Sequence, residues 1–274
     1  MERESRDMSA GRPTGWHGGM VEEQESHSPL QRPLTEVFNA SALSPPSSCI
    51  VILCYTTRDM NAAFFDLDGT LIDSRADLGA TVNFTRQELG LAPIPQEEAV
   101  SYVGNGARRL LERAIPEMAG RFDEIWPMYR EQYQAHMLDQ TVLYPGVRST
   151  LAELHDRGWL MGINTNKPNF ACRAILEHFG IARYFGNAVV AGGDCPELKP
   201  SPLPLRQTAS LMRGHRLSSH DWMVGDSWTD MECGVNAGVK TAFCTFGFGQ
   251  LKEARYTIKI NRFDELLRHL KAED

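Results

Sequence analysis

From residue 60 onward the sequence alternates short apolar runs with segments of helical period. The runs that we expect to be strands span residues 62–66, 159–164, 188–191, 222–225, 241–245 and 256–260. The helical patterns between them span residues 147–157, 170–178, 203–213 and 263–270. This alternation is typical of a parallel sheet with helices on both faces. The sequence therefore predicts a doubly wound, Rossmann-like α/β core.

One long interval, residues 74–143, breaks the alternation because it has no strand pattern. Its helical patterns span residues 78–89, 96–103, 107–114 and 121–137. A helical insertion at one edge of a sheet is typical of a lid over the ligand site. We therefore expect a helical cap at 74–143, inserted into a core made of 60–73 and 144–274.

Residues 1–59 are rich in Gly, Ser, Pro, Glu and Arg and keep no helical or strand period for long. Such composition predicts a disordered extension. Met60 directly precedes the first strong strand, so it is an alternative translation start. Acidic residues in this extension argue against an organelle transit peptide.

Composition limits the classes of partner. With 274 residues and a net charge of −7, the chain is not expected to bind nucleic acid. Its six cysteines form no CxxC pair, which favours free thiols in the cytoplasm. The apolar run at 49–55 is too short to cross a membrane. We expect a small-molecule partner, no membrane association, and a monomer or homodimer.

The first predicted strand ends abruptly in Asp66-Leu67-Asp68-Gly69-Thr70. Side chains two apart on a strand point the same way, and Gly69 ends the strand, so Asp66 and Asp68 would face one site at its carboxyl end. Ligands of open parallel sheets bind at that end. Two neighbouring carboxylates need a cation or a proton, and Mg²⁺ would leave an Asp oxygen free to attack phosphorus. The alternative is an ordinary polar turn.

Two more polar clusters follow later strands. The segment Asn164-Thr165-Asn166-Lys167-Pro168 offers a hydroxyl and backbone N–H groups that suit phosphate oxygens. Lys199, followed by Pro200, could place positive charge over a phosphate. Taken alone, the first is also a common turn and the second a common solvated lysine.

A further strand ends in Gly225-Asp226-Ser227, with Asp230 four residues after the first acid. Asp226 could complete a Mg²⁺ site, while Asp230 orients water or a lysine. The structural alternative is a helix start, with Ser227 or Thr229 as the N-cap and Asp230 in the first turn. The two interpretations are compatible.

In this order, Asp-x-Asp-Gly-Thr, Thr-Asn-Lys, Lys-Pro and Gly-Asp-Ser-x-x-Asp resemble the motif set of the haloacid dehalogenase superfamily. The resemblance runs from Met60 to about Leu270. It implies that Asp66 is the nucleophile that becomes an aspartyl phosphate. It also implies that Asp68 is the general acid and base, with its backbone carbonyl on Mg²⁺.

The same resemblance assigns the other site residues. Thr165 would contact the transferring phosphoryl group with Asn166 beside it, and Lys199 would stabilise its charge. Asp226 would be the remaining protein ligand of Mg²⁺, with Asp230 in support. Because dehalogenases of the superfamily lack a carboxylate at the position of Asp68, the resemblance favours a phosphatase or phosphomutase.

Within the superfamily, the predicted cap resembles that of phosphoglycolate phosphatases at residues 102–111. Backbone N–H groups of Gly104, Asn105 and Gly106, with Arg108, would then meet the far end of a small acidic substrate. The alternative is a plain helix–helix turn with Asn105 as N-cap.

The sequence departs from the family pattern at three positions close to the motifs. Ser201 stands where the family commonly has His, and Trp228-Thr229 replaces a usual Arg-Asn. These departures leave the four catalytic positions intact and loosen only the substrate assignment.

The resemblance thus predicts a Mg²⁺-dependent phosphatase for a small phosphate monoester, with 2-phosphoglycolate as first choice. The alternatives are a sugar-phosphate phosphatase and a phosphomutase similar to β-phosphoglucomutase. A non-enzymatic alternative makes residues 1–59 a partner-binding tail.

Overall fold

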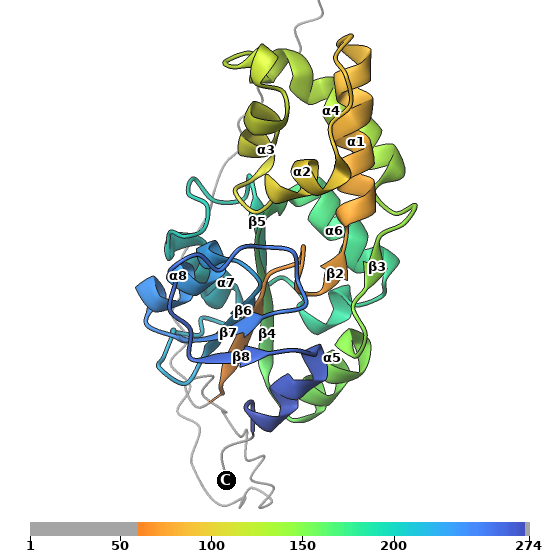
Figure 1. Cartoon of the computed structure of the whole chain (residues 1–274). Helices are drawn as coiled ribbons and strands as arrows, with labels where there is room; N and C mark the ends of the chain where they lie inside the picture. The colour runs from red at the N-terminus through yellow and green to blue at the C-terminus, as the bar shows by residue number, and fades with distance from the viewer. Residues whose placement is uncertain (1–59, 272–274) are drawn as a thin grey trace, which may run out of the picture. The chain divides into compact units, whose positions relative to one another are not determined.

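The computed structural model describes residues 60–271, and the predictions for residues 1–59 lie outside them. The core of this part is a six-stranded parallel sheet with the order β5-β4-β1-β6-β7-β8 (Figure 1). The strands are β1 (Ala62–Phe65), β4 (Leu160–Pro168), β5 (Val189–Gly192), β6 (Trp222–Gly225), β7 (Lys240–Cys244) and β8 (Ile258–Ile260). The sheet confirms the predicted α/β class.

β1 lies in the interior of the sheet, paired with β4 on one side and β6 on the other. Its sequence, Ala-Ala-Phe-Phe, is fully buried, as expected for a strand covered on both faces. Successive side chains point to opposite faces, so Phe64 and Phe65 belong to two separate hydrophobic clusters. This burial fixes the position of the acidic residues that follow the strand.

Helices cover both faces of the sheet. The cluster around Phe64 contains residues of α7 (Leu203–Leu211) and α8 (Trp228–Ala237). The cluster around Phe65 contains residues of α5 (Val147–Asp156), α6 (Asn169–His178) and the 3₁₀ helix Phe263–Arg268. The predicted helix at 263–270 is thus a 3₁₀ helix, and its first residue Phe263 packs on Phe65 with ring centroids 5.9 Å apart.

The interval between β1 and β4 is mainly helical. Figure 1 shows its helices together at the top of the view, beyond the edge of the sheet and not on either of its faces. They are α1 (Arg75–Glu88), α2 (Gln96–Ser101), α3 (Ala107–Ala114) and α4 (Phe122–His136). Two strands that the sequence did not predict join this helical segment to the core. β2 (Ile72–Asp73) and β3 (Val142–Leu143) pair antiparallel, so the chain leaves and returns along one ribbon.

The buried carboxylate of Asp77 reinforces this ribbon. It accepts hydrogen bonds from the backbone N–H groups of Gln140 and Thr141, and from the Thr141 hydroxyl at 2.7 Å. The first turn of α1 is therefore tied to the segment that leads back into β3.

No helix in residues 60–271 is long and apolar enough to span a membrane. Cys172, Cys195, Cys233 and Cys244 are free thiols.

Candidate active site

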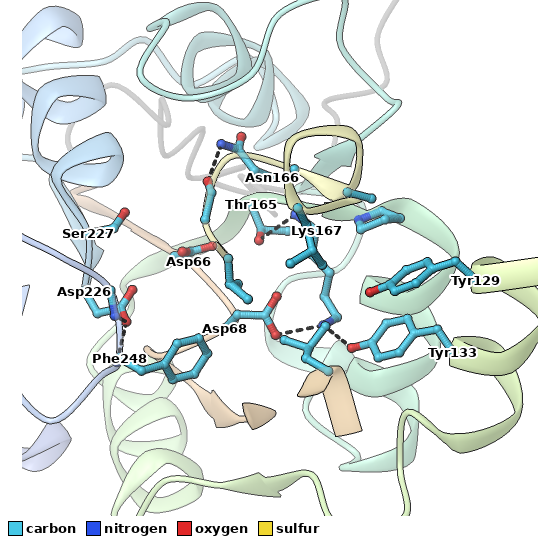
Figure 2. Close-up of a pocket in the computed structure, with 18 residues that line it drawn as sticks. Asp66, Asp68, Tyr129, Tyr133, Thr165, Asn166, Lys167, Asp226, Ser227 and Phe248 are labelled. Carbon is cyan, nitrogen blue, oxygen red and sulfur yellow. Dashed lines mark hydrogen bonds and ion pairs between the residues drawn. The ribbon is translucent and has the colours of Figure 1, made fainter. Parts of the chain in front are cut away.

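The carboxyl ends of β1, β4 and β6 bring the predicted site residues to one pocket. Asp66, Thr165 and Asp226 come directly after or near the ends of these neighbouring strands and all line it (Figure 2). Its cavity volume is about 50 Å³. One water needs roughly 10–15 Å³, so the cavity accommodates several water-sized groups. The pocket is lined by residues at the ends of the core strands and by residues of α1, α3 and α4.

Gly69 allows the chain to turn sharply behind the first acidic pair. Its φ is +78°, in the left-handed region, and an added Cβ would lie 1.8 Å from Oδ2 of Asp226. No side chain fits there. The glycine therefore lets the loop after β1 lie directly against the acid that ends β6.

Lys199 connects two buried acids, Asp66 and Asp230, of which only Asp66 lines the pocket. Its Nζ lies 2.9 Å from Oδ1 of Asp66 and 2.5 Å from Oδ1 of Asp230. Burial and the charge of Asp230 raise the pKa of Asp66 to about 6, although Lys199 and the Thr165 hydroxyl act in the opposite direction. Burial alone would lower the pKa of Lys199, but Asp230 and Asp66 raise it above its usual value. Lys199 is therefore a permanent cation here.

Asp230 also organises the start of α8. Its Oδ2 accepts hydrogen bonds from the backbone N–H and the hydroxyl of Ser227, at 3.0 and 2.7 Å. Ser227 and Asp230 thus form a capping box, with Ser227 as the N-cap residue. One oxygen of Asp230 therefore accepts from the N-cap residue Ser227, and the other pairs with Lys199. These contacts agree with both interpretations of this acid, as a first-turn residue of a helix and as a group that orients a lysine.

Asp226 is held by a loop from the far end of the chain. Its Oδ2 accepts hydrogen bonds from the backbone N–H groups of Phe248 and Gly249, at 2.9 and 2.7 Å. Burial, followed by the charges of Asp230 and Asp66, raises the pKa of this carboxyl well above its ordinary value. The segment 245–249 resembles phosphoglycolate phosphatases in sequence, but Phe248 and Gly249 were not predicted as site residues, because their contribution is backbone N–H groups.

Asp66, Asp226 and Asp230 form an acidic cluster that suits a divalent cation. One oxygen from each lies within 4.8 Å of the others, and all three residues are buried. Lys199 offsets only part of their charge. Carboxylate oxygens with excess negative charge are what a hard divalent cation requires. The donor set therefore fits a cation of this kind.

Asp68 faces a different set of partners. Its Oδ1 accepts hydrogen bonds from the Ser74 hydroxyl at 2.6 Å and from Nζ of Lys167 at 2.7 Å. Lys167 also donates to the hydroxyl of Tyr133, at 2.5 Å. In the view of Figure 2, Asp68 lies between Asp66 on one side and the Lys167–Tyr133 pair on the other. Lys167, Ser74 and Tyr133 were not predicted as site residues.

Asn166 has its side-chain amide fully engaged by backbone groups. It donates to the carbonyls of Gly104 and Lys199, at 2.9 and 3.1 Å, and accepts from the backbone N–H of Lys199 at 2.9 Å. It thereby joins the end of β4 to the lysine loop and to the loop before α3. Its predicted contact with substrate stays a prediction.

The loop Gly104-Asn105-Gly106 lies at the pocket, although its middle residue does not line it. Gly104 and Gly106 line the pocket, whereas the Asn105 side chain accepts a hydrogen bond from Arg113 at 3.0 Å. Gly106, not Asn105, is the N-cap residue of α3, so the N-cap interpretation of Asn105 is wrong.

Arg108 does not line the pocket, contrary to the expectation that it meets the substrate. Its guanidinium lies over the ring of Phe122, 3.9 Å from the centroid, and 3.7 Å from Asp123. Its side chain is 55% exposed. The only Lys or Arg among the pocket-lining residues within 60–271 is Lys167.

A model of a known protein family matches most of the core of this chain. The family is described as haloacid dehalogenase-like hydrolase, and the match spans residues 63–244. It includes the acidic pair after β1, the end of β4, Lys199 and the acids after β6.

Two curated relatives are named phosphoglycolate phosphatase. A phosphoglycolate phosphatase of Vibrio parahaemolyticus is 37% identical over 206 residues, which cover 70% of this chain and 87% of that protein. A phosphoglycolate phosphatase of Cereibacter sphaeroides is 34% identical over 224 residues, covering 78% of this chain and all of that protein.

Solved structures share the same fold. The crystal structure of a predicted phosphoglycolate phosphatase from Haemophilus somnus 129PT matches with a TM-score of 0.67 and 26% identity, over 78% of this chain and 99% of that one. A putative phosphoglycolate phosphatase from Lactobacillus delbrueckii matches with a TM-score of 0.70 and 20% identity, over 79% of this chain and all of that one. The latter likeness supports the fold alone.

Proposed function

The chain belongs to the haloacid dehalogenase-like hydrolase family, and from this premise we propose that it hydrolyses a small phosphate monoester through an aspartyl phosphate on Asp66. Its similarity to curated phosphoglycolate phosphatases indicates a phosphoric monoester hydrolase of that type. The single observation that carries the mechanism is the arrangement around Asp66. A buried carboxylate, 2.9 Å from a buried ammonium group, lines the same pocket as a second carboxylate, Asp68.

In the first step, an oxygen of Asp66 attacks phosphorus and the bond from phosphorus to the ester oxygen breaks. Lys199 contributes fixed positive charge as negative charge builds up on the phosphoryl oxygens, which is where preorganised groups accelerate such reactions most. Thr165, whose hydroxyl reaches Asp66, is placed to donate to one of these oxygens. The site thus holds the nucleophile and two stabilising groups together.

Asp68 moves the protons of both steps. Its protonated form gives a proton to the departing alkoxide, and its ionised form then takes a proton from water. The resulting hydroxide attacks phosphorus, the bond between phosphorus and Asp66 breaks, and inorganic phosphate leaves. Ser74 and Lys167 fix one oxygen of Asp68, which orients the carboxyl group for this exchange. General acid–base help of this kind contributes about 10²–10⁴ in rate.

We propose Mg²⁺ as the cofactor, held by Asp66 and Asp226, by the backbone carbonyl of Asp68, and with Asp230 close by. Bound there, it would neutralise the substrate phosphate and the acidic cluster. Asp226 is prepared for this role because two backbone N–H groups fix its Oδ2.

We propose 2-phosphoglycolate as the substrate and the helices α1–α4 as a cap over it. The substrate assignment follows the names of the relatives. The cap proposal is supported by the pocket lining, to which α3 contributes Ala107 and Leu110 and α4 contributes Tyr129 and Tyr133. Closing these helices over the site would exclude bulk water.

The test is phosphate release from 2-phosphoglycolate with Mg²⁺, followed by acid quenching of a reaction with ³²P-labelled substrate. The proposal predicts label on the wild-type protein and none on Asp66→Asn. An unlabelled but active wild-type enzyme would refute the covalent mechanism.

A further inference from the structure

Lys167 combines a buried charge with access to the pocket. Its side chain is only 2% exposed, and its ammonium group is held between Asp68 and Tyr133. Burying a charge is costly unless the charge is paired, so Asp68 accounts for part of its stability. An ammonium group has three N–H donors, and the two contacts to protein oxygens use two of them. One donor is thus left for a ligand in the pocket that the side chain lines.

Within residues 60–271, the pocket that Lys167 lines contains no other cationic side chain. Beyond Asp66, Asp68, Thr165 and Asp226, the other side chains of the lining carry no charge that could neutralise an anion: Leu78, Val103, Ala107, Leu110, Tyr129, Tyr133, Asn166, Pro168, Ser227 and Phe248. Burial raises the pKa of Tyr133 well above its usual value, and the charges of Asp68 and Asp77 raise it further, so its hydroxyl stays neutral. A negative group at this end of the pocket therefore has one cation to bind.

The distribution of charge over the whole site also indicates Lys167 as the residue that would bind a second anionic group. Four acids and two lysines meet here: Asp66, Asp68, Asp226, Asp230, Lys167 and Lys199. Lys199 lies against Asp66 and Asp230, where the phosphoryl group would react. Arg108 lies outside the pocket. Among the described residues that line this pocket, Lys167 is the cation that remains for a second anionic group of a substrate.

We propose that Lys167 is the specificity-determining residue that binds the carboxylate of the substrate. This inference rests on the proposed function, since it assumes a phosphate monoester that carries an acidic group. Tyr133 holds the ammonium group from α4, and its ring lies 4.9 Å from Nζ and stacks on Tyr129. The carboxylate site is therefore assembled by the end of β4 and the helical segment together (Figure 2).

The experiment compares two substrates of matched size in the full-length protein. 2-Phosphoglycolate carries the carboxylate, and its amide, 2-phosphoglycolamide, replaces that group with a neutral one. For the wild type we expect kcat/KM to favour the acid by about 10–100-fold, the worth of a hydrogen bond to a charged group. In Lys167→Met we expect the acid-to-amide ratio of kcat/KM to fall to about one, and a ratio up to about threefold away from one still counts as a loss of preference.

Two further variants test whether the preference for the acid depends on Lys167. Tyr133→Phe keeps the ring but removes the oxygen that accepts from Lys167, so we expect KM for the acid to rise about 2–12-fold while KM for the amide changes less. Arg108→Met removes an exposed charge that lies outside the pocket, so its ratio should equal that of the wild type. These two variants keep the test informative if Lys167→Met folds poorly.

The outcomes separate the two proposals. If Lys167→Met slows the acid and the amide equally, Lys167 acts only on Asp68 and the specificity proposal fails, while the phosphatase proposal stands. A wild type that hydrolyses both substrates equally well also overturns the specificity proposal alone. A folded wild type that releases phosphate from neither substrate overturns the proposed function.

Discussion

The ammonium group of Lys199 lies 2.9 Å from the carboxylate of Asp66, and this contact holds together segments separated by more than 130 residues. The same ammonium group also reaches Asp230, so three buried charges form one network. Removal of the lysine would leave two buried acids facing each other and Asp226 without compensation. This network connects the stability of the site with its chemistry.

We therefore expect Lys199→Met to destabilise the metal-free protein by about 3–5 kcal/mol, the usual cost of leaving a buried charge unpaired. Mg²⁺ should restore part of this stability, because it supplies positive charge at the same cluster. Urea denaturation with and without Mg²⁺ measures both effects. Lys259→Met, at an exposed position of β8, is the control and should change stability by less than about 0.5 kcal/mol. Equal stability of the two variants would contradict the network.

The role of Asp68 predicts a dependence on the leaving group. Asp68→Asn should lower kcat for an alkyl phosphate by about 10²–10⁴, since it can no longer donate or accept the required proton. An aryl phosphate with a nitrophenol leaving group needs little protonation. We therefore expect this variant to release about one equivalent of nitrophenol in a rapid burst and then to turn over slowly. Absence of a burst, with steady turnover close to the wild type, would rule out this role.

Gly69 and Gly90 form a matched pair for testing the turn after β1. Both have positive φ, +78° and +72°, but a Cβ at Gly69 would lie 1.8 Å from Asp226, whereas at Gly90 nothing lies within 4 Å. Both alanine variants carry the backbone strain, of order 1–3 kcal/mol. Only Gly69→Ala should also lose Mg²⁺ affinity and activity, because it displaces Asp226. If both variants bind Mg²⁺ as the wild type does, the close approach is not required for the site.

The raised pKa of Asp66 predicts a pH dependence of metal binding. Because its pKa is about 6 in the metal-free protein, this carboxyl is mostly protonated at pH 5 and mostly ionised at pH 7. Metal ligands must be deprotonated, so Mg²⁺ affinity should fall about tenfold from pH 7 to pH 5 through this group alone. Calorimetry in buffers of different ionisation enthalpy should detect proton release on binding near pH 6. Affinity independent of pH over this range would contradict the prediction.

Strand and helix patterns predicted most of the core because burial on both sheet faces leaves a strong signal in the sequence. β6 and α3 have the predicted bounds, and β1 ends one residue earlier than expected. β4 runs to Pro168, four residues beyond its prediction, with an irregular register against β5. β2 and β3 have two residues each, which is too short for any period to appear.

The pocket could be predicted only in part, for a related reason. Asp66, Thr165 and Asp226 were found because polar residues after apolar strands are visible in the sequence. The contact between Lys167 and Asp68 spans 99 residues, and that between Lys167 and Tyr133 joins the core to α4. No local pattern records such pairs. Tyr133 looks like any other apolar position of a helix until the fold brings it to the lysine.

The most direct test of the central claim is inorganic phosphate release by the full-length protein with Mg²⁺, beside Asp66→Asn. The substrates are 2-phosphoglycolate, sugar phosphates, nucleotides and an amino-sugar phosphate. We predict strong preference for 2-phosphoglycolate, and a loss of at least about 10³-fold in Asp66→Asn with the fold retained. Retained turnover by folded Asp66→Asn would contradict the account, as would conversion of a sugar phosphate to its isomer without phosphate release.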